Sequence, residues 1–232
     1  MKIAILTGAS RGIGLEIVKR LIAMDYRVYG LARSFESTDF SHENFVPVQC
    51  DVQDTEKLIK AVGDIEEKEP EIHLLVNNAG LGYFGPHEQI PVKGIQAMVR
   101  TNLEAPLILC RLLLRSLKKS RGTIISISSV TAKKISTHGC AYAATKAGLS
   151  HFATSLFDEV RKSGVKVVTI HPDITKTPFY DDLDFMYGDD AQSYIMPESV
   201  AQAVENILKQ PEGTVISELT IRPQKHMISR KK

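Results

Sequence analysis

Residues 2–14 read KIAILTGASRGIG, an apolar run that leads directly into a turn with glycines at positions 8, 12 and 14. The run predicts a buried strand, and the residues after Gly12 have the apolar spacing of a helix. Such a turn presents backbone N–H groups and the positive end of the helix dipole to a phosphate. Gly8 permits a tight bend, Gly12 lets a diphosphate approach the backbone, and Gly14 lets the helix pack on the sheet. The stretch therefore predicts a dinucleotide-binding βα unit, although glycines can also serve only to shape a turn.

Short β-rich runs alternate with longer segments of helical period along the rest of the 232 residues. Strands are predicted at 2–7, 27–32, 45–50, 72–77, 122–128, 165–171 and 214–222. Helices are predicted at 12–24, 54–68, 93–118, 141–162 and 197–209. Several strands are almost continuously apolar, so helices must cover both faces of a parallel sheet. We predict one Rossmann-type, doubly wound α/β domain over 1–232, with seven parallel strands.

Two connections in this pattern stand out by their length. The segment 34–44 is too short for a full crossover helix, so a loop or a single turn is expected there. The longest irregular stretch is 175–197, and a loop of that length in a compact domain is usually a functional lid. We therefore expect a substrate lid at about 175–197.

Composition narrows the class of function. The chain has 43% hydrophobic and 24% charged residues, and its 29 Lys and Arg against 27 Asp and Glu leave a net charge of only +2. The one basic cluster is the tail at 222–232, so nucleic-acid binding is not expected. Three separated cysteines without zinc-ligand spacing predict neither a metal site nor a disulfide framework. No segment approaches the ~20 apolar residues of a membrane helix, and no signal peptide is evident, so we expect a cytoplasmic protein without membrane contact.

The first turn has the pattern TGxxxGxG and resembles that of the short-chain dehydrogenase/reductase family. The resemblance extends over essentially the whole chain. It is supported in order by Asp51-Val52, Asn77-Asn78-Ala79-Gly80, Asn102, Ser129, Tyr142 with Lys146, and Pro172 through Thr177. It implies an oxidoreductase that transfers a hydride between a nicotinamide and a small carbonyl compound or secondary alcohol. It also implies a homodimer or homotetramer, formed through the two long helices that flank the fifth strand.

Tyr142 and Lys146 stand four residues apart on a predicted helix, so their side chains project from one face. A carbonyl reduced by hydride needs a proton, and a phenol of pKa ~10 exchanges one near neutrality only beside a cation. We therefore expect Lys146 to lower the pKa of Tyr142, the acid/base. The resemblance implies that Ser129 binds the substrate oxygen, that Lys146 also holds the nicotinamide ribose, and that Asn102 holds a proton-relaying water. Ser129 can instead cap a turn, and a mid-helix Asn102 can face solvent.

The cofactor is predicted from the end of the second strand. An enzyme of this type that prefers NAD(H) usually has an acidic residue there, whereas this chain has Ala32 followed by Arg33. Arg33 and Arg11 suit a 2′-phosphate, which predicts NADP(H) rather than NAD(H), unless both are ordinary surface side chains. Further expected cofactor contacts are Gly8, Ser10, Gly12, Ile13 and Gly14 in the first turn, Asp51 and Val52 at the adenine, Asn78, Tyr142, Lys146, and Ile174 and Thr177 at the carboxamide.

The chain departs from the family pattern at position 173, where Asp173 replaces the usual glycine after Pro172. We expect the Asp173 side chain to turn outward, because a carboxylate near the diphosphate would weaken cofactor binding. The lid combines aromatic and acidic residues, which favours an apolar neutral carbonyl substrate, although the aromatic side chains can equally serve to pack the lid. The alternative function is a catalytically silent dinucleotide-binding sensor, which a disrupted Ser-Tyr-Lys set would indicate.

Overall fold

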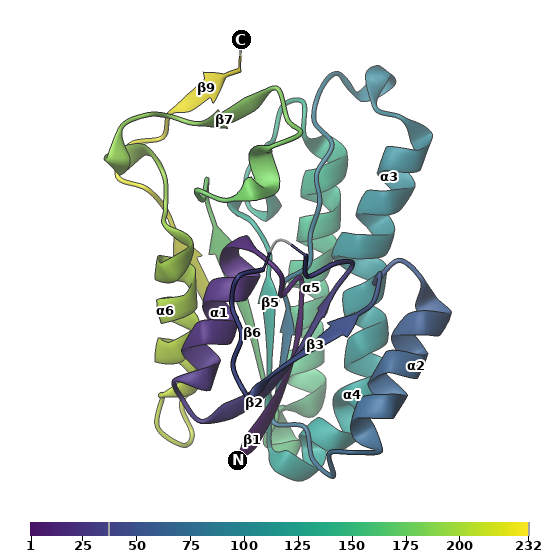
Figure 1. Ribbon diagram of the computed structural model, residues 1–232. Coiled ribbons are helices and arrows are strands. Elements are labelled where there is room, and N and C mark those ends of the chain that lie inside the picture. The colour runs from purple at the N-terminus through teal and green to yellow at the C-terminus, as the bar shows by residue number, and fades with distance from the viewer. Residues whose placement is uncertain (37, 232) are drawn as a thin grey trace.

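The computed structural model describes residues 1–36 and 38–231. Within them, seven strands form one sheet in the order β3-β2-β1-β4-β5-β6-β8, and all neighbours are parallel (Figure 1). Their bounds are β1 Lys2–Thr7, β2 Tyr26–Ala32, β3 Phe45–Gln49, β4 Leu74–Asn77, β5 Thr123–Ile127, β6 Lys166–Pro172 and β8 Glu218–Ile221. The strand order reverses between β1 and β4, and ligands of such sheets bind at the carboxyl ends of the strands beside this point. The Rossmann-type fold predicted from the sequence is confirmed.

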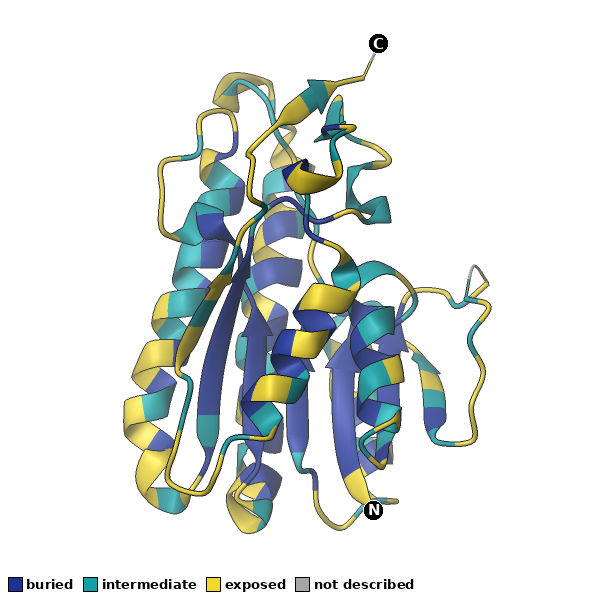
Figure 2. Cartoon of the chain, turned by 90° about the vertical axis from the view of Figure 1, so that its left-hand side faces the viewer, coloured by how far each residue is buried: buried dark blue, intermediate teal, exposed yellow. Residues whose placement is uncertain are grey.

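Helices cover both faces of the sheet, as the apolar strands require. They are α1 Gly12–Ile22, α2 Thr55–Glu66, α3 Val92–Val99, α4 Ala105–Ser120, α5 Cys140–Val160 and α6 Pro197–Leu208. One core cluster joins the sheet to α2, α4 and α5, and the other joins it to α1 and α6. Figure 2 shows the strands buried between these two helical layers. Leu109, Leu113 and Leu149 are buried within the single chain, so these leucines serve the core rather than a contact between copies.

The helix predicted at 93–118 is interrupted. A π-helical turn, η2 Arg100–Glu104, separates α3 from α4, and Pro106 stands in the first turn of α4. Proline has no N–H, and its ring crowds the carbonyl four residues earlier, which here belongs to Asn102. The widened turn relieves that conflict, and it places Asn102 in a fully buried position.

The connection 34–44 has no helix among its described residues, as expected. Phe35 and Phe40 pack against the core cluster on the α1 side, and each ring lies 5.9 Å from that of Phe45 on β3. Aromatic side chains thus cover the part of the sheet where a crossover helix would lie. The neighbouring β3 is an edge strand, and it carries Pro47 opposite Gly30 of β2.

The predicted lid at 175–197 has more structure than the sequence indicated. It contains two 3-10 turns, η5 Pro178–Tyr180 and η6 Ala191–Ser193, and a short strand, β7 Phe185–Tyr187. This strand pairs antiparallel with β9 Ile228–Arg230 from the C-terminal tail, which the sequence analysis missed. Figure 1 shows the β7–β9 pair above the carboxyl edge of the large sheet. None of the helices in the described ranges is long and apolar enough to cross a bilayer.

Candidate active site

The glycine turn after β1 has the backbone conformation that its sequence predicts. Gly8 and Gly12 have φ values of +71° and +58°, which favour glycine. A Cβ atom on Gly14 would stand 2.0 Å from the Gly8 carbonyl oxygen, so only glycine fits there. The Asn78 side chain donates to the carbonyl oxygens of Thr7 (2.9 Å) and Gly8 (3.1 Å). Asn78 therefore fixes the turn by satisfying backbone groups across the sheet.

The N-terminus of α1 is suited to an anion. Its N-cap is Arg11, whose side chain makes no capping hydrogen bond, and its first turn carries no acidic residue. The first N–H groups of a helix need an external acceptor, and here neither a capping side chain nor a carboxylate supplies one. Ser10, just before this helix, is held by Thr38, which donates to the Ser10 carbonyl oxygen at 2.7 Å. The residues present therefore fit a dinucleotide diphosphate.

The residues predicted at the adenosine end lie near the carboxyl ends of β2 and β3. Arg33 is exposed directly after β2, and Gln49 donates to its carbonyl oxygen at 3.0 Å. Arg11 is also exposed, and its guanidinium lies 4.0 Å from Asp181 of the lid. Asp51 accepts a hydrogen bond from the backbone of Gln53, so its carboxylate already caps a turn.

Ser129, Tyr142 and Lys146 come together at the carboxyl edge of the sheet. Ser129 lies two residues after the end of β5, while Tyr142 and Lys146 lie on one side of the first turns of α5, and all three are buried. The Ser129 side chain lies close enough to the Tyr142 phenol to lower its pKa. Ser128 instead points to α5, where it donates to the Lys146 carbonyl oxygen. Ser129, not Ser128, is therefore the serine that faces the phenol.

Ser129 is held from two sides. Its hydroxyl accepts from the backbone and the side chain of Thr131, so it also caps the short turn after β5. Its carbonyl oxygen lies 3.1 Å from Nδ1 of the fully buried His171 on β6. A carbonyl only accepts, so Nδ1 of His171 donates here. These contacts fix the orientation of Ser129 toward Tyr142.

The expected effect of Lys146 on Tyr142 is wrong for this arrangement. Burial raises the pKa of Tyr142 to about 12, and the hydrogen bond with Ser129 only partly offsets this. Burial also lowers the pKa of Lys146 to about 8. The Lys146 ammonium donates to the Ile127 carbonyl oxygen at 2.9 Å and lies 5.8 Å from the centre of the Tyr142 ring. Desolvation of the phenol sets the direction of the Tyr142 shift, and residue spacing alone does not reveal how deeply the phenol is buried.

Asn102 is fully buried and faces the site rather than solvent. Its side chain accepts from the backbone N–H of Leu81 at 3.0 Å and donates to the carbonyl oxygen of the same residue at 2.9 Å. It also donates to the Thr145 hydroxyl at 3.1 Å. Asn102 thereby ties the segment after β4 to α5, the helix that carries Tyr142 and Lys146.

The segment after β6 differs from expectation. The Asp173 side chain is only 9% exposed, and it lies 4.0 Å from Lys134 and 3.6 Å from His226, so it does not turn outward. It also accepts from the Ile174 N–H at 2.9 Å, while the Ile174 carbonyl accepts from Ile195 at 2.9 Å. Both backbone groups of Ile174 thus have protein partners, and its contact with the carboxamide stays a prediction. Contacts with the Lys134 ammonium and the His226 ring explain why the carboxylate is held inward.

Aromatic residues cover the Tyr142 ring. Phe84, from the segment after β4, lies 5.2 Å from it between ring centres, and Phe179 of the lid lies 6.1 Å from it. Thr177, just before Phe179, lies against the glycine turn, where a Cβ atom on Gly12 would stand 3.3 Å from it. The sequence analysis placed Thr177 in the site but missed Phe84, whose only signal is an aromatic residue soon after the Asn-Ala-Gly stretch.

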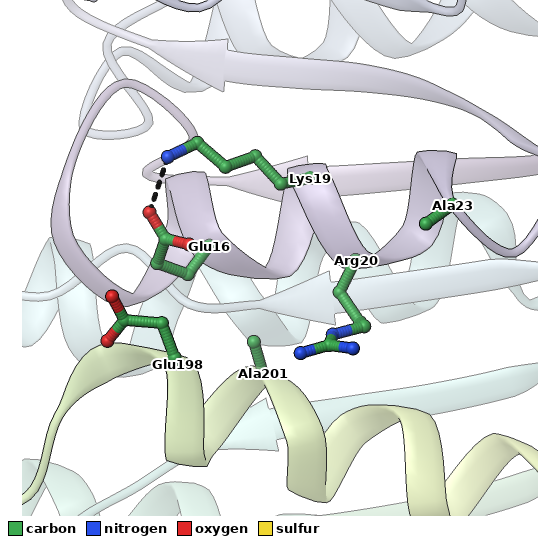
Figure 3. A pocket seen from close by; sticks show the side chains of 6 residues that line it. All are labelled: Glu16, Lys19, Arg20, Ala23, Glu198 and Ala201. Carbon is green, nitrogen blue, oxygen red and sulfur yellow. Dashed lines mark hydrogen bonds and ion pairs between the residues drawn. The ribbon is translucent and has the colours of Figure 1, made fainter.

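A surface hollow between α1 and α6 lies apart from this cluster (Figure 3). Three of its four charged side chains already have partners, since Lys19 pairs with Glu16 at 2.7 Å and Arg20 with Glu205 at 3.2 Å. The chemistry-bearing residues are therefore those at the carboxyl edge of the sheet.

A family model for the short chain dehydrogenase matches residues 2–186. The chain belongs to the short-chain dehydrogenase family. An uncharacterized oxidoreductase of Staphylococcus saprophyticus is 30% identical to this dehydrogenase over 231 residues, with 96% of this chain and 97% of the relative covered. Serine 3-dehydrogenase of Rhizobium radiobacter is 29% identical, with coverages of 94% and 92%. Among solved structures, an alcohol dehydrogenase of the archaeon Thermococcus sibiricus, complexed with 5-hydroxy-NADP, matches this short-chain dehydrogenase with a TM-score of 0.88, 27% identity and 97% coverage of both chains.

Proposed function

We propose that this short-chain dehydrogenase uses NADP(H) to interconvert a small carbonyl compound and the corresponding secondary alcohol, with Tyr142 as acid/base. The observation that carries the proposal is the close approach of the Ser129 side chain to the Tyr142 phenol, with the Lys146 ammonium 5.8 Å from the centre of the Tyr142 ring. Two hydroxyl donors at one point suit a carbonyl oxygen, on which negative charge develops during reduction.

The cofactor is NADP(H). The anion-binding start of α1 takes the diphosphate, and Arg33 after β2, together with Arg11, takes the 2′-phosphate. Complex formation of the Thermococcus sibiricus relative with 5-hydroxy-NADP is consistent with this choice. When bound, the nicotinamide supplies or accepts the hydride.

The residues of the chain perform the proton chemistry. Ser129 and Tyr142 hold the substrate oxygen, and Tyr142 passes its proton to it. Lys146, with a pKa of about 8, is mostly protonated at pH 7 and stabilises the phenolate that remains.

The chain works as one domain with a lid at 175–197, and copies associate as a homodimer or homotetramer through α4 and α5. The aromatic side chains of the lid surround Tyr142 with apolar surface, which favours an uncharged substrate and excludes water from the reacting oxygen.

The test is a spectrophotometric panel that follows NADPH and NADH consumption with aldehydes, ketones and diketones, and NADP⁺ or NAD⁺ reduction with secondary alcohols and serine. Tyr142→Phe is the test variant. Tyr26→Phe is the matched control, because Tyr26 is also buried but starts β2 at the opposite end of the sheet. We expect Tyr142→Phe to lower kcat by about 10²–10⁴-fold, with NADPH affinity retained.

Equal rates for the wild type and Tyr142→Phe would refute the acid/base role. A wild-type protein that binds NADPH but turns over no member of the panel would instead support the silent sensor. A strong preference for NADH would overturn the assignment of the two arginines.

A further inference from the structure

The C-terminal tail, residues 225–231, is bound along the lid. Strand β9 pairs with β7 in a register that sets Arg230 opposite Phe185 and Ile228 opposite Tyr187. Just beyond this ladder, the Gly188 N–H donates to the Met227 carbonyl oxygen at 3.2 Å. Figure 1 shows that the two strands lie side by side above the carboxyl edge of the sheet, over the site.

Lys231 is the most heavily engaged residue of the tail. Its N–H donates to the Asp184 carbonyl oxygen at 2.8 Å. Its ammonium donates to the Asp181 carbonyl oxygen at 2.7 Å and to that of Tyr180. Tyr180 ends η5, and the last carbonyls of a helical turn lack partners within it, so a lysine there caps the turn. One side chain thus closes the short helix that begins directly before Phe179.

The other end of the tail holds the far end of the lid. The Lys225 N–H donates to the Gln192 carbonyl oxygen at 2.9 Å, and its ammonium pairs with Asp190 at 2.8 Å. Both partners belong to the turn η6 or stand directly before it. The basic tail, which the sequence analysis left without a role, therefore faces the acidic lid at both of its ends.

The base of the tail is fixed by the residue that departs from the family pattern. His226 lies 3.6 Å from Asp173, which directly follows β6 and is almost fully buried. Lys134, from the segment after β5, approaches the same carboxylate at 4.0 Å. Asp173 therefore joins the tail to the segment that follows Ser129. A glycine at this position would have no group to offer His226.

The lid that the tail holds reaches the reacting phenol through packed rings. Phe185 of β7 lies 5.2 Å from Phe84, and Phe84 lies 5.2 Å from Tyr142. Tyr180, which Lys231 caps, lies 5.3 Å from Phe179 and 5.8 Å from Phe185. Displacement of the tail would thus loosen the aromatic cover of Tyr142.

We propose that the tail is a positioning element of the active site, in which Lys231 holds the lid closed over Tyr142 and Asp173 fixes the base of the tail. The tail sets how tightly the enzyme retains its carbonyl substrate, while the cofactor site at the glycine turn does not depend on it. This role rests on the proposed function, because the substrate held under the lid is the carbonyl compound that Ser129 and Tyr142 bind.

The test variant is Lys231→Met, which keeps the length of the side chain and removes its ammonium. Lys209→Met is the matched control, because Lys209 is likewise exposed and hydrogen-bonded, but to Glu205 on α6. Hydrogen exchange of the unliganded proteins, read on peptides that contain Gly188, reports the closure of the lid. Steady-state kinetics with NADPH and the best carbonyl substrate report its consequence.

We expect the lid amides of Lys231→Met to exchange about three- to tenfold faster than those of the wild type. The KM for the carbonyl substrate should rise by a similar factor. The kcat and the NADPH dissociation constant should stay within about twofold of wild type, and Lys209→Met should change none of these. Asp173→Asn should loosen the lid in the same direction, because it weakens the contact with His226.

Unchanged exchange in Lys231→Met would overturn the proposal. A fall in kcat at constant KM would overturn it too, because that pattern indicates a role in the chemical step. The exchange measurement needs no turnover. A wild-type protein that reduces no carbonyl compound would thus refute the proposed function. The exchange rates of the lid amides in Lys231→Met and wild type would still show whether the tail holds the lid.

Discussion

Replacement of Lys146 by methionine should abolish turnover and yet make the protein more stable at neutral pH. The Lys146 side chain is 3% exposed, and its single hydrogen bond to the protein goes to the Ile127 carbonyl oxygen. Burial lowers its pKa from 10.5 to about 8. The folded protein therefore disfavours the charged form that exists at pH 7. Methionine has a similar length and carries no charge to desolvate.

The magnitude follows from linkage. Between the folded and the unfolded pKa of Lys146, the unfolded chain binds one more proton, so stability rises with pH across the window from about 8 to 10.5. At 1.36 kcal/mol per pKa unit, the charged lysine destabilises the fold by about 3 kcal/mol at pH 7 and by about 1 kcal/mol at pH 9.5. Loss of the hydrogen bond to Ile127 costs about 1 kcal/mol at either pH. The methionine variant should gain about 2 kcal/mol at pH 7 and almost nothing at pH 9.5.

Thermal unfolding followed by circular dichroism at the two pH values measures this difference. A gain of about 2 kcal/mol corresponds to a Tm about 4–8 °C above wild type at pH 7 for a chain of this size. Lys162→Met, at an exposed position after α5, is the control and should leave Tm within about 1 °C. The reasoning fails if Lys146→Met is less stable than wild type at pH 7, or if its advantage grows as the pH rises.

Three further changes test other parts of the site. Gly14→Ala puts a Cβ atom 2.0 Å from the Gly8 carbonyl oxygen, so we expect about 3 kcal/mol less stability in urea and weaker NADPH binding by fluorescence titration. Asn102→Ala removes three hydrogen bonds from a buried position, which should lower the unfolding free energy by about 2–4 kcal/mol, whereas Asn206→Ala on α6 should leave it nearly unchanged. Arg33→Ser should raise KM for NADPH about tenfold without altering KM for NADH, and an equal rise for both would show that Arg33 binds no 2′-phosphate.

The parallel sheet was predictable because its inner strands are apolar on both faces and most of its helices are amphipathic. The break at Arg100–Glu104 was harder to foresee, because Pro106 is compatible with an ordinary helix start as well as with a π-helical turn. Strand β9 was missed for a different reason. Its sequence, Ile-Ser-Arg, is too short to show a period, and its pairing with β7 depends on contacts between segments distant in the chain.

In the site, the identity of Ser129, Tyr142 and Lys146 followed from spacing, but their electrostatics did not. The pKa of Tyr142 depends on how completely Phe84 and Phe179 exclude water, and no local motif encodes that cover. The inward position of Asp173 likewise depends on His226, which lies far along the chain. Local patterns identify residues, whereas burial and long-range charge set their protonation.

Pro47 on β3 has a consequence for how copies of this protein avoid aggregation. The Cys50 N–H donates to the Ala32 carbonyl oxygen on β2, so strand alternation directs position 47 away from β2, toward the open flank of the sheet. Its missing N–H therefore weakens no bond within the fold. A strand from another copy that paired with β3 would lack one backbone N–H donor at the middle of this five-residue edge strand. Pro47 is therefore compatible with the fold of the monomer and at the same time disfavours amyloid-like strand pairing along the β3 edge.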